Sequence, residues 1–399
     1  MLASKFKLIC LFINSLSLLL ITTSTYANSS AILTNSINHE FYHTCNKQHF
    51  SGAVLIAING QIIFQRACGL ANRNFNIPND INTKFNLGSV SKLFTSIAIA
   101  QLIQQRRISL TTSLDSVLPS WLPKKEAKKI TIGQLLIHTT GLGNFMDDKR
   151  WQLGADAGLY VNISDYKQLL KDNKLLFHPG ESQLYSNNGY LLLGGIIERL
   201  TRISYPDYLS KEIFSKAGMK ETGIYRLDDP VKNRAEGYIL ICKKNKCYWK
   251  NNNYEAPFVA SPAGGAYSTL TDLFKFSEAL HHCKLLNSDM THEVLSINVI
   301  SPSSGITKKL LNINNKMLQE SVSHYGFAGT WNKYGFAVWD KPFLVGHTGG
   351  TAGASAFFAT SPNNKYTIII LSNTSGSAPI ILYKKIRILL GFSPKIMNY

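Results

Sequence analysis

Residues 85–103 read FNLGSVSKLFTSIAIAQLI. From Val90 to Ile103 nearly every helical face would be apolar, which predicts a helix that is buried on all sides. Ser89 and Lys92 stand one helical turn apart at its start, so their side chains share one side of the helix. Apolar neighbours disfavour a charged amine and lower its pKa, and a neutral amine can take the proton of a serine hydroxyl. The stretch therefore predicts a nucleophile, Ser89, beside its own base, Lys92.

The serine–lysine spacing is not specific by itself, because it recurs at Ser4–Lys7 and at Ser164–Lys167 with nothing to support it. Two further motifs lie downstream of the buried helix. The first reads Tyr185-Ser186-Asn187, and the second reads His347-Thr348-Gly349-Gly350 on a predicted strand. Each motif taken singly has a purely structural explanation, such as a half-buried aromatic residue, a turn or a bend. Three such motifs in one chain favour a single functional site.

Periodicity on either side of these motifs predicts an α+β fold. Asn59-Gly60 between two apolar runs, 52–58 and 61–65, is typical of a β-hairpin. Near the other end, short apolar runs predict four strands, and a closing amphipathic helix follows at 378–391. The middle of the chain is mainly helical. Strands at both ends with helices between them predict one sheet built from both chain ends and flanked by helices, plus an inserted, mainly helical lobe.

Composition excludes several classes of protein. The 399 residues are 45% hydrophobic and carry a formal charge of +18, which is too apolar for a disordered chain. The positive charge is spread over separate lysine pairs, and no basic patch interleaved with aromatic residues accompanies it, so we expect no nucleic-acid partner. An exported basic protein can still associate electrostatically with anionic polymers or lipid headgroups of the cell envelope.

The first 27 residues are typical of an export signal. Lys5 and Lys7 precede an apolar stretch from Leu8 to about Ile21, and Thr25-Tyr26-Ala27 offers small residues at a cleavage site. The stretch is shorter than the ~20 residues of a membrane-spanning helix. We expect a cleaved signal peptide, a mature chain of residues 28–399, no stable membrane span and a periplasmic or secreted location. An uncleaved N-terminal anchor is the alternative.

Export places the cysteines in an oxidising compartment. Cys242 and Cys247 flank a short turn between two predicted strands, so they are close enough for a disulfide across a hairpin; two reduced thiols are the alternative. The mature chain retains five cysteines, so at least one of them stays unpaired or finds an intermolecular partner.

A sequence near the N-terminus raises the alternative of a zinc-dependent enzyme. His39-Glu40-Phe41-Tyr42-His43 imitates the helix of a zinc protease. Too few residues precede it to build the sheet that such proteases place upstream, and no glutamate follows before Glu126 as a delayed third ligand. An amphipathic helix over 33–45 explains the pattern better. His281-His282-Cys283 is interpreted as a helix end, so we expect neither a metal nor another cofactor.

In order and surroundings, the three motifs resemble those of the serine penicillin-recognising family of class C β-lactamases and D-alanyl-D-alanine carboxypeptidases. That family orders them as serine-x-x-lysine, tyrosine-x-asparagine, and lysine or histidine followed by threonine and glycine. Two shorter signatures agree, LLIHTTGL at 135–142 and AGG at 263–265. The resemblance covers about 51–373. It implies a β-lactamase/transpeptidase-like fold, which we divide into an α/β lobe (about 45–110 and 330–399) and a helical lobe (about 111–329).

The resemblance also implies a role for each motif residue. Ser89 would be the acylated nucleophile, and Lys92 and Tyr185 would share its proton as general base and then acid. His347 would orient the tyrosine or add positive potential. Asn187 would hold the substrate's amide and Thr348 its carboxylate, while backbone N–H groups of Ser89 and Gly350 would form the oxyanion hole. The substrate-binding positions implied in this way are Asn187, Thr348, Gly349 and Gly350.

One position bears on the substrate. Typical class C β-lactamases carry lysine where this chain carries His347, and histidine there resembles DD-peptidases and related peptidases or esterases. An imidazole would be only partly protonated near neutral pH and is a weaker anchor for a carboxylate than lysine. We therefore expect an exported serine hydrolase of the DD-peptidase/carboxypeptidase type that acts through an acyl-enzyme on a peptide or small-molecule substrate, peptidoglycan-derived or a β-lactam. The alternatives are a class C-like β-lactamase, a carboxylesterase, or a non-catalytic envelope-binding protein with the same fold.

Overall fold

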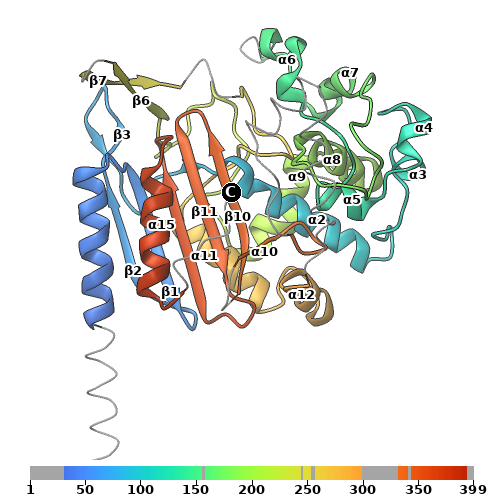
Figure 1. Cartoon of the computed structure of the whole chain (residues 1–399). Helices are drawn as coiled ribbons and strands as arrows, with labels where there is room; N and C mark the ends of the chain where they lie inside the picture. The colour runs from blue at the N-terminus through green and yellow to red at the C-terminus, as the bar shows by residue number, and fades with distance from the viewer. Residues whose placement is uncertain are drawn as a thin grey trace, which may run out of the picture.

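The two ends of the chain meet in one six-stranded antiparallel sheet (Figure 1). The computed structural model describes residues 31–154, 158–243, 246–252, 257–298, 331–339 and 343–392. Within them the strand order is β2-β1-β12-β11-β10-β9. The N-terminal β1 pairs with the C-terminal β12, which confirms the expected sheet built from both ends. The strands are β1 (Gly52–Ile58), β2 (Gln61–Cys68), β9 (Ala337–Trp339), β10 (Leu344–Thr351), β11 (Ala354–Thr360) and β12 (Tyr366–Ser372).

The first hairpin forms where its turn residues predict it. Asn59 and Gly60 have φ angles of 50° and 71°, and a two-residue type I′ turn needs positive φ at both central positions. The register then pairs Ile58 with Gln61 and Gly52 with Cys68. The inner strand β1 is buried over six of its seven residues, as expected for a strand that is covered on both faces.

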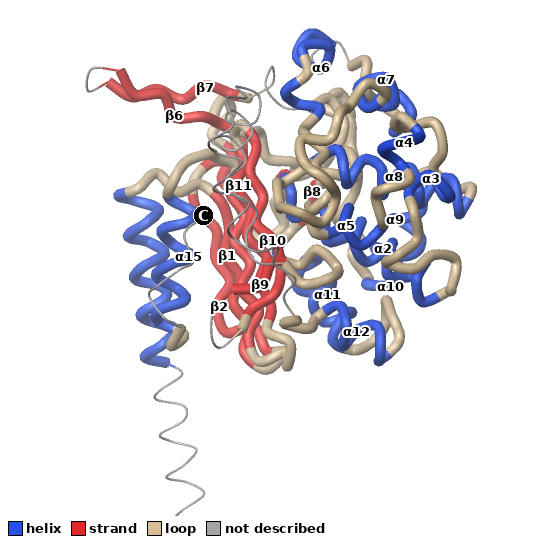
Figure 2. Tube along the Cα trace, turned by 45° about the vertical axis from the view of Figure 1, so that its right-hand side comes forward, coloured by secondary structure: helices blue, strands red, loops and turns tan. Residues whose placement is uncertain are grey.

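Helices cover both faces of this sheet (Figure 2). The N-terminal helix, described over residues 31–47, and α15 (Ala378–Leu389) lie on one side, and an ion pair between Glu40 and Lys385 joins them. On the other side α11 (Leu270–His281) packs on β1 and β12, and α2 (Lys92–Gln104) contacts β10. The sheet therefore presents the end of β10 to the helical part of the molecule.

The buried helix predicted from the opening stretch is confirmed, with one difference at its start. Eleven of the thirteen residues of α2 are buried. It begins with a short 3₁₀ turn, η1 (Gly88–Ser91), and Ser91 accepts a hydrogen bond at Oγ from the backbone N–H of Ala266. The tighter turn brings Ser89 to the mouth of the helix while Lys92 is already inside the core.

Most remaining helices form the mass beside α2 (Figure 1). They include α8 (Asn187–Thr201), which contacts both α2 and α5 (Ile132–Leu136). The other helices are α3 (Leu114–Val117), α4 (Lys124–Ala127), η2 (Phe145–Asp147), α6 (Lys149–Gly154), η3 (Ile163–Tyr166), α7 (Lys167–Leu170), α9 (Tyr205–Leu209), η4 (Ser210–Phe214), α10 (Ser215–Ala217) and α12 (Ser288–Val294). Three two-stranded pairs complete the described part of the fold: β3 (Leu70–Asn72) with β4 (Ile77–Pro78), β5 (Phe85–Asn86) with β8 (Tyr267–Ser268), and β6 (Tyr238–Lys243) with β7 (Lys246–Asn251).

Two disulfides are present among the described residues. Cys242–Cys247 links β6 to β7 directly across the hairpin, which confirms the expected pairing. Cys45–Cys68 ties the N-terminal helix to the edge strand β2 and was not predicted from the sequence. Cys283 is free and exposed, so it is the unpaired thiol among the five cysteines of the described residues.

The expected export signal at 1–27 lies outside the described residues. No helix in the described part of the chain combines the length and the apolar character that crossing a bilayer demands. The division into two lobes stays a prediction. α11, whose residues fall within the range expected for the helical lobe, forms part of the cover of the sheet.

Candidate active site

A cleft opens where the start of α2, the Tyr185–Asn187 segment and the end of β10 meet. Ser89, Tyr185, Asn187 and Gly350 all line it. β9 pairs with β10 only along Leu344–Gly346, so no described strand covers the later part of β10 on that side. The structure thus brings three motifs that are far apart in the sequence to one place.

Lys92 lies directly beside Ser89. Its Nζ is 3.1 Å from Ser89 Oγ and 2.8 Å from Asn187 Oδ1, and it also donates a hydrogen bond to the backbone carbonyl of Ala263. The side chain is fully buried, and burial holds the pKa of its amine well below the usual range for lysine. The buried environment of Lys92 therefore favours the neutral amine over the ammonium form.

The hydrogen-bond partners of Lys92 direct its lone pair. An amide oxygen and a carbonyl oxygen can only accept hydrogen bonds, so the two N–H groups of a neutral amine go to Asn187 and Ala263. The lone pair is then left for the third neighbour, the Ser89 hydroxyl, which can donate its proton. This arrangement is what general-base activation of a serine requires.

Tyr185 lies over the same amine. Its ring centroid is 4.8 Å from Lys92 Nζ, and its ring packs at 4.4 Å from that of His138. Asn144 fixes the backbone around the tyrosine, since its side chain donates to Tyr185 O and accepts from the N–H of Asn187. Tyr185 is thus held near the serine–lysine pair by contacts on both sides.

His347 is present at the site in a different state from the one expected. Its ring centroid lies 6.2 Å from that of Tyr185, and its side chain is only 2% exposed. Burial is the main cause that lowers its pKa to about 3, so the imidazole is neutral at neutral pH. The expectation of a partly protonated histidine is wrong, and of the two roles considered only orientation of the tyrosine fits.

Close backbone packing builds the pocket around the Ser89 N–H. A Cβ atom on Gly349 would lie 2.0 Å from Leu87 O, and one on Gly264 would lie 3.0 Å from Gly88 O. Any other residue at these two positions would push η1, β10 and the 264 loop apart. The first N–H groups of a helix have no partner within it. The N–H of Ser89 and that of the neighbouring Gly350 are therefore the candidate oxyanion donors.

Thr348, like Gly349, stands near the cleft residue Gly350 in the sequence but is not itself a cleft residue. It is half-buried on β10 and does not line the cleft, whereas Thr351, three residues further, does. Among the described residues that line the cleft, none is aspartate, glutamate, lysine, arginine or histidine. The described cleft thus offers hydrogen-bond donors and apolar surface rather than a charge that would bind a carboxylate.

Two residues at the site escaped the sequence analysis as functional residues. His138 is buried, accepts at Nδ1 from the N–H of Ser186, and packs edge-on against Trp331 at 5.0 Å. Trp331 in turn lies 5.0 Å from His347, so one aromatic cluster supports both Tyr185 and His347. His138 stood in the LLIHTTGL signature, which marks it as part of the family pattern without giving its place. Nothing in the sequence pointed to Trp331.

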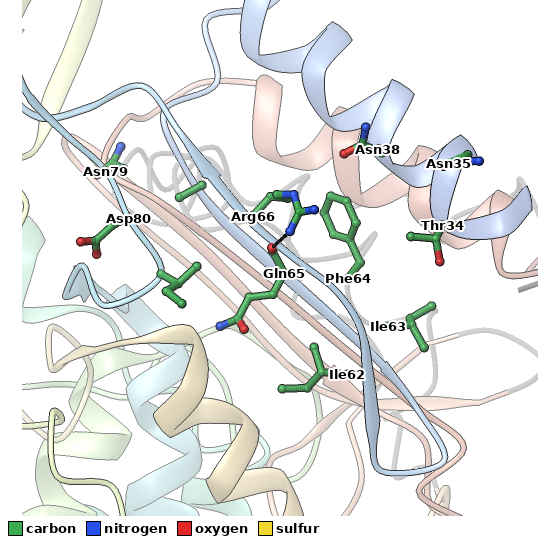
Figure 3. Close-up of a pocket in the computed structure, with 12 residues that line it drawn as sticks. Thr34, Asn35, Asn38, Ile62, Ile63, Phe64, Gln65, Arg66, Asn79 and Asp80 are labelled. Carbon is green, nitrogen blue, oxygen red and sulfur yellow. Dashed lines mark hydrogen bonds between the residues drawn. The ribbon is translucent and has the colours of Figure 1, made fainter. Parts of the chain in front are cut away.

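A second groove lies between the N-terminal helix and β2 (Figure 3) and shares no described lining residue with the cleft. Arg66 and Asp80 line it, but no serine, cysteine or histidine does. At the zinc-protease-like sequence, Glu40 pairs with Lys385, and no cluster of three metal-binding side chains occurs in the described chain. The serine–lysine cleft is the candidate active site.

Comparison with known proteins agrees with this geometry. The family model described as Beta-lactamase matches residues 39–391. Penicillin-binding protein 4* of Bacillus subtilis is 29% identical over 347 residues, which are 83% of this chain and 70% of that protein. The chain spans 61% of the length of the flp proteins of Staphylococcus aureus that it also matches.

Solved structures share the fold. A penicillin-binding protein from Bacillus halodurans superposes with a TM-score of 0.69 at 25% identity, over 88% of this chain and 98% of the other. The D-amino acid amidase from Ochrobactrum anthropi SV3 gives a TM-score of 0.67 at 20% identity, over 90% and 97% of the two chains. At 20% identity, the similarity to the amidase is evidence for the fold alone.

Proposed function

Since the chain belongs to the beta-lactamase family, we propose that it is an exported serine hydrolase which forms an acyl-enzyme at Ser89 and cleaves amide bonds in the manner of a DD-peptidase. The observation that carries the proposal is the buried Lys92 amine, which lies 3.1 Å from Ser89 Oγ and has Asn187 and Ala263 as its other hydrogen-bond partners. Export rests on the signal-like residues 1–27, and peptidase activity on the relatives named penicillin-binding proteins.

The proposed reaction has two steps, acylation of Ser89 and hydrolysis of the acyl-enzyme. In the first, Ser89 Oγ attacks the carbonyl carbon while its proton passes to Lys92, and the N–H groups of Ser89 and Gly350 stabilise the oxyanion. Tyr185, beside Lys92, relays that proton to the leaving group as the amide or ester bond breaks. In the second, water attacks the acyl carbon, the acid is released and Ser89 regains its proton. No metal or organic cofactor takes part in this scheme.

His347 orients Tyr185 through the aromatic cluster, since its imidazole is neutral at neutral pH. Asn187 has two functions in the scheme. Its Oδ1 holds the Lys92 amine, and its amide nitrogen, 3.8 Å from Met146 Sδ, remains near the cleft to position the substrate. Thr348 would bind a carboxylate only at the border of the cleft, and Gly349 shapes the backbone next to Gly350.

An amidase or esterase is the second candidate, and one observation favours it. No described residue lining the cleft carries a positive charge, whereas a carboxypeptidase has to recognise a free carboxylate. A substrate with an uncharged leaving group would need no such anchor. Parallel turnover of a D-alanyl-D-alanine peptide, nitrocefin and a p-nitrophenyl ester separates peptidase, β-lactamase and esterase.

Covalent labelling tests the shared mechanism. We expect a fluorescent penicillin or a fluorophosphonate to add one acyl or phosphonyl group by intact mass, and Ser89→Ala to abolish the addition. Ser164→Ala is the matched control, because Ser164 and Lys167 have the same spacing, but Ser164 is exposed on η3, Lys167 begins α7, and neither lines the cleft. Labelling that persists in Ser89→Ala would refute the assignment, as would a wild-type protein that neither labels nor turns over any substrate and so has only a binding role.

A further inference from the structure

Three packed aromatic rings form part of the lining of the cleft. Phe145, Trp151 and Tyr166 all line it, and we call these three residues the aromatic wall. Phe145 packs edge-on against Trp151 at 4.8 Å and against Tyr166 at 5.1 Å, and Trp151 and Tyr166 stack at 5.6 Å. Edge-to-face and stacked rings at these separations attract one another and form a stiff surface.

The aromatic wall is fixed to the catalytic segment. Asn144, the residue before Phe145, makes the two hydrogen bonds that hold Tyr185 and Asn187. Ser186 Oγ also donates to the carbonyl of Gly143 in the same stretch. The backbone that positions the tyrosine therefore positions the aromatic wall as well, so a group bound there has a defined place relative to Ser89.

The aromatic wall lies on the side of the cleft where Asn187 points. The amide nitrogen of Asn187 contacts Met146 Sδ, and Met146 lines the cleft next to Phe145. In the proposed reaction Asn187 positions the substrate's amide, which belongs to the part of the substrate that becomes the acyl group. The oxyanion donors, Ser89 and Gly350, line the same cleft from η1 and β10.

We infer that the aromatic wall is the binding site for the side chain of the acyl group, and that the enzyme prefers acyl donors whose side chain is apolar and preferably aromatic. The inference rests on the proposed acyl-enzyme function and narrows its substrate class. Apolar side chains gain free energy when they leave water for such a surface, and aromatic ones gain further from ring contacts. An acyl group that carries a charge would be desolvated there without a described partner of opposite charge.

A series of esters with one leaving group tests this inference. The p-nitrophenyl esters of acetate, hexanoate, 3-phenylpropanoate and the anionic monosuccinate differ only in the acyl part. We expect kcat/KM to rise on the order of tenfold or more from acetate to 3-phenylpropanoate, in line with the gain from filling an apolar pocket. Hexanoate should lie between them, and succinate should be the poorest.

Variants of the aromatic wall localise the effect. Trp151→Ala should lower the ratio of kcat/KM for 3-phenylpropanoate to that for acetate by about tenfold, and the milder Phe145→Leu should lower it in the same direction if the first variant does not fold. Phe75→Ala is the control, because Phe75 is 77% exposed and lies outside the cleft. Its ratio should equal that of the wild type.

The outcomes separate the inference from the proposed function. Ester turnover that depends on Ser89 but shows no preference for phenylpropanoate, or a preference for succinate, overturns the inference and leaves the acyl-enzyme mechanism standing. A preference that survives in Trp151→Ala and Phe145→Leu also overturns it. Absence of labelling and of turnover on every substrate instead refutes the proposed function.

Discussion

At Lys92, burial disfavours the ammonium form of the amine. No carboxylate among the described residues pairs with this amine to offset the effect. A buried lysine without such a partner releases its proton far more easily than an exposed one. The same burial keeps His347 neutral nearby. The site can therefore hold two basic side chains close together without the repulsion of two positive charges.

Replacement of Lys92 by arginine separates charge from basicity. A guanidinium keeps its proton at all accessible pH values, so Lys92→Arg retains hydrogen-bond donors for Asn187 and Ala263 but has no lone pair for Ser89. We expect kcat on a p-nitrophenyl ester to fall by ~10²–10⁴-fold, the usual contribution of a general base. Lys275→Arg on α11, where the side chain is 41% exposed, is the control and should keep full activity. Near-normal turnover by Lys92→Arg would show that Lys92 is not the base.

The neutral His347 gives a prediction about pH. Its pKa of about 3 lies below the range in which activity is measured, so this imidazole does not change charge between pH 5 and 8. Any inflection of kcat/KM in that window must arise from another group. We expect His347→Gln to lower the rate through a less well oriented Tyr185 but to leave the shape of the pH profile unchanged. An inflection near pH 6 that disappears in the variant would contradict the buried, neutral state.

At the scale of helices and strands, turn residues and apolar runs in the sequence predicted the elements whose structure depends on neighbouring residues. Asn59-Gly60 specified its hairpin because only a few residue types accept positive φ at both positions, and the apolar run at 90–103 specified α2. The start of α11 is also determined locally, since the Thr269 side chain accepts a hydrogen bond from the N–H of Asp272. These features depend on neighbours in the sequence, so the sequence reveals them.

Features made by distant contacts were not predictable in the same way. Cys45 and Cys68 meet only because the N-terminal helix packs beside β2, and the aromatic wall forms only when Phe145, Trp151 and Tyr166 converge. The motif spacing indicated which residues serve the cleft, and the structure brings Ser89, Lys92 and Tyr185 together there. The motif spacing could not indicate that the His347 side chain would be desolvated, because burial is a property of the assembled fold.

The two disulfides should differ in their effect on stability. Cys45–Cys68 closes a loop with a sequence separation of 23, against 5 for Cys242–Cys247. On the chain-entropy model the longer loop contributes ~3 kcal/mol to the free energy of unfolding and the shorter one ~2 kcal/mol. We expect Cys45→Ser with Cys68→Ser to lower the denaturant midpoint more than Cys242→Ser with Cys247→Ser. The reverse order would show that the β6–β7 hairpin contributes more than its loop length implies.

For the molecule as a whole, histidines withdrawn from solvent couple stability to pH at two places, the aromatic cluster around Tyr185 and the end of α11. His138 lies beside Tyr185, His281 at the end of α11 and His347 on β10, and burial lowers the pKa of each. His281 hydrogen-bonds Thr360 through Nε2, so its contribution is independent of the catalytic cleft. Acid therefore acts on the sheet and on the helical part at once.

The sign of this coupling follows from the direction of the shifts. In the unfolded chain a histidine takes up a proton below about pH 6.5, while folded His281 does so only near about pH 4 and folded His347 near about pH 3. Between those values the unfolded state binds more protons, so stability is lost as the pH falls. At pH 5 the loss is about 2 kcal/mol for each such histidine.

We expect denaturant unfolding to show a markedly lower free energy of unfolding at pH 5.0 than at pH 7.5, and His281→Gln to reduce that difference by about 2 kcal/mol. His39→Gln is the control, because His39 is 77% exposed and should leave the difference unchanged; a wild-type protein equally stable at both pH values would show that these imidazoles are accessible to protons in the native state.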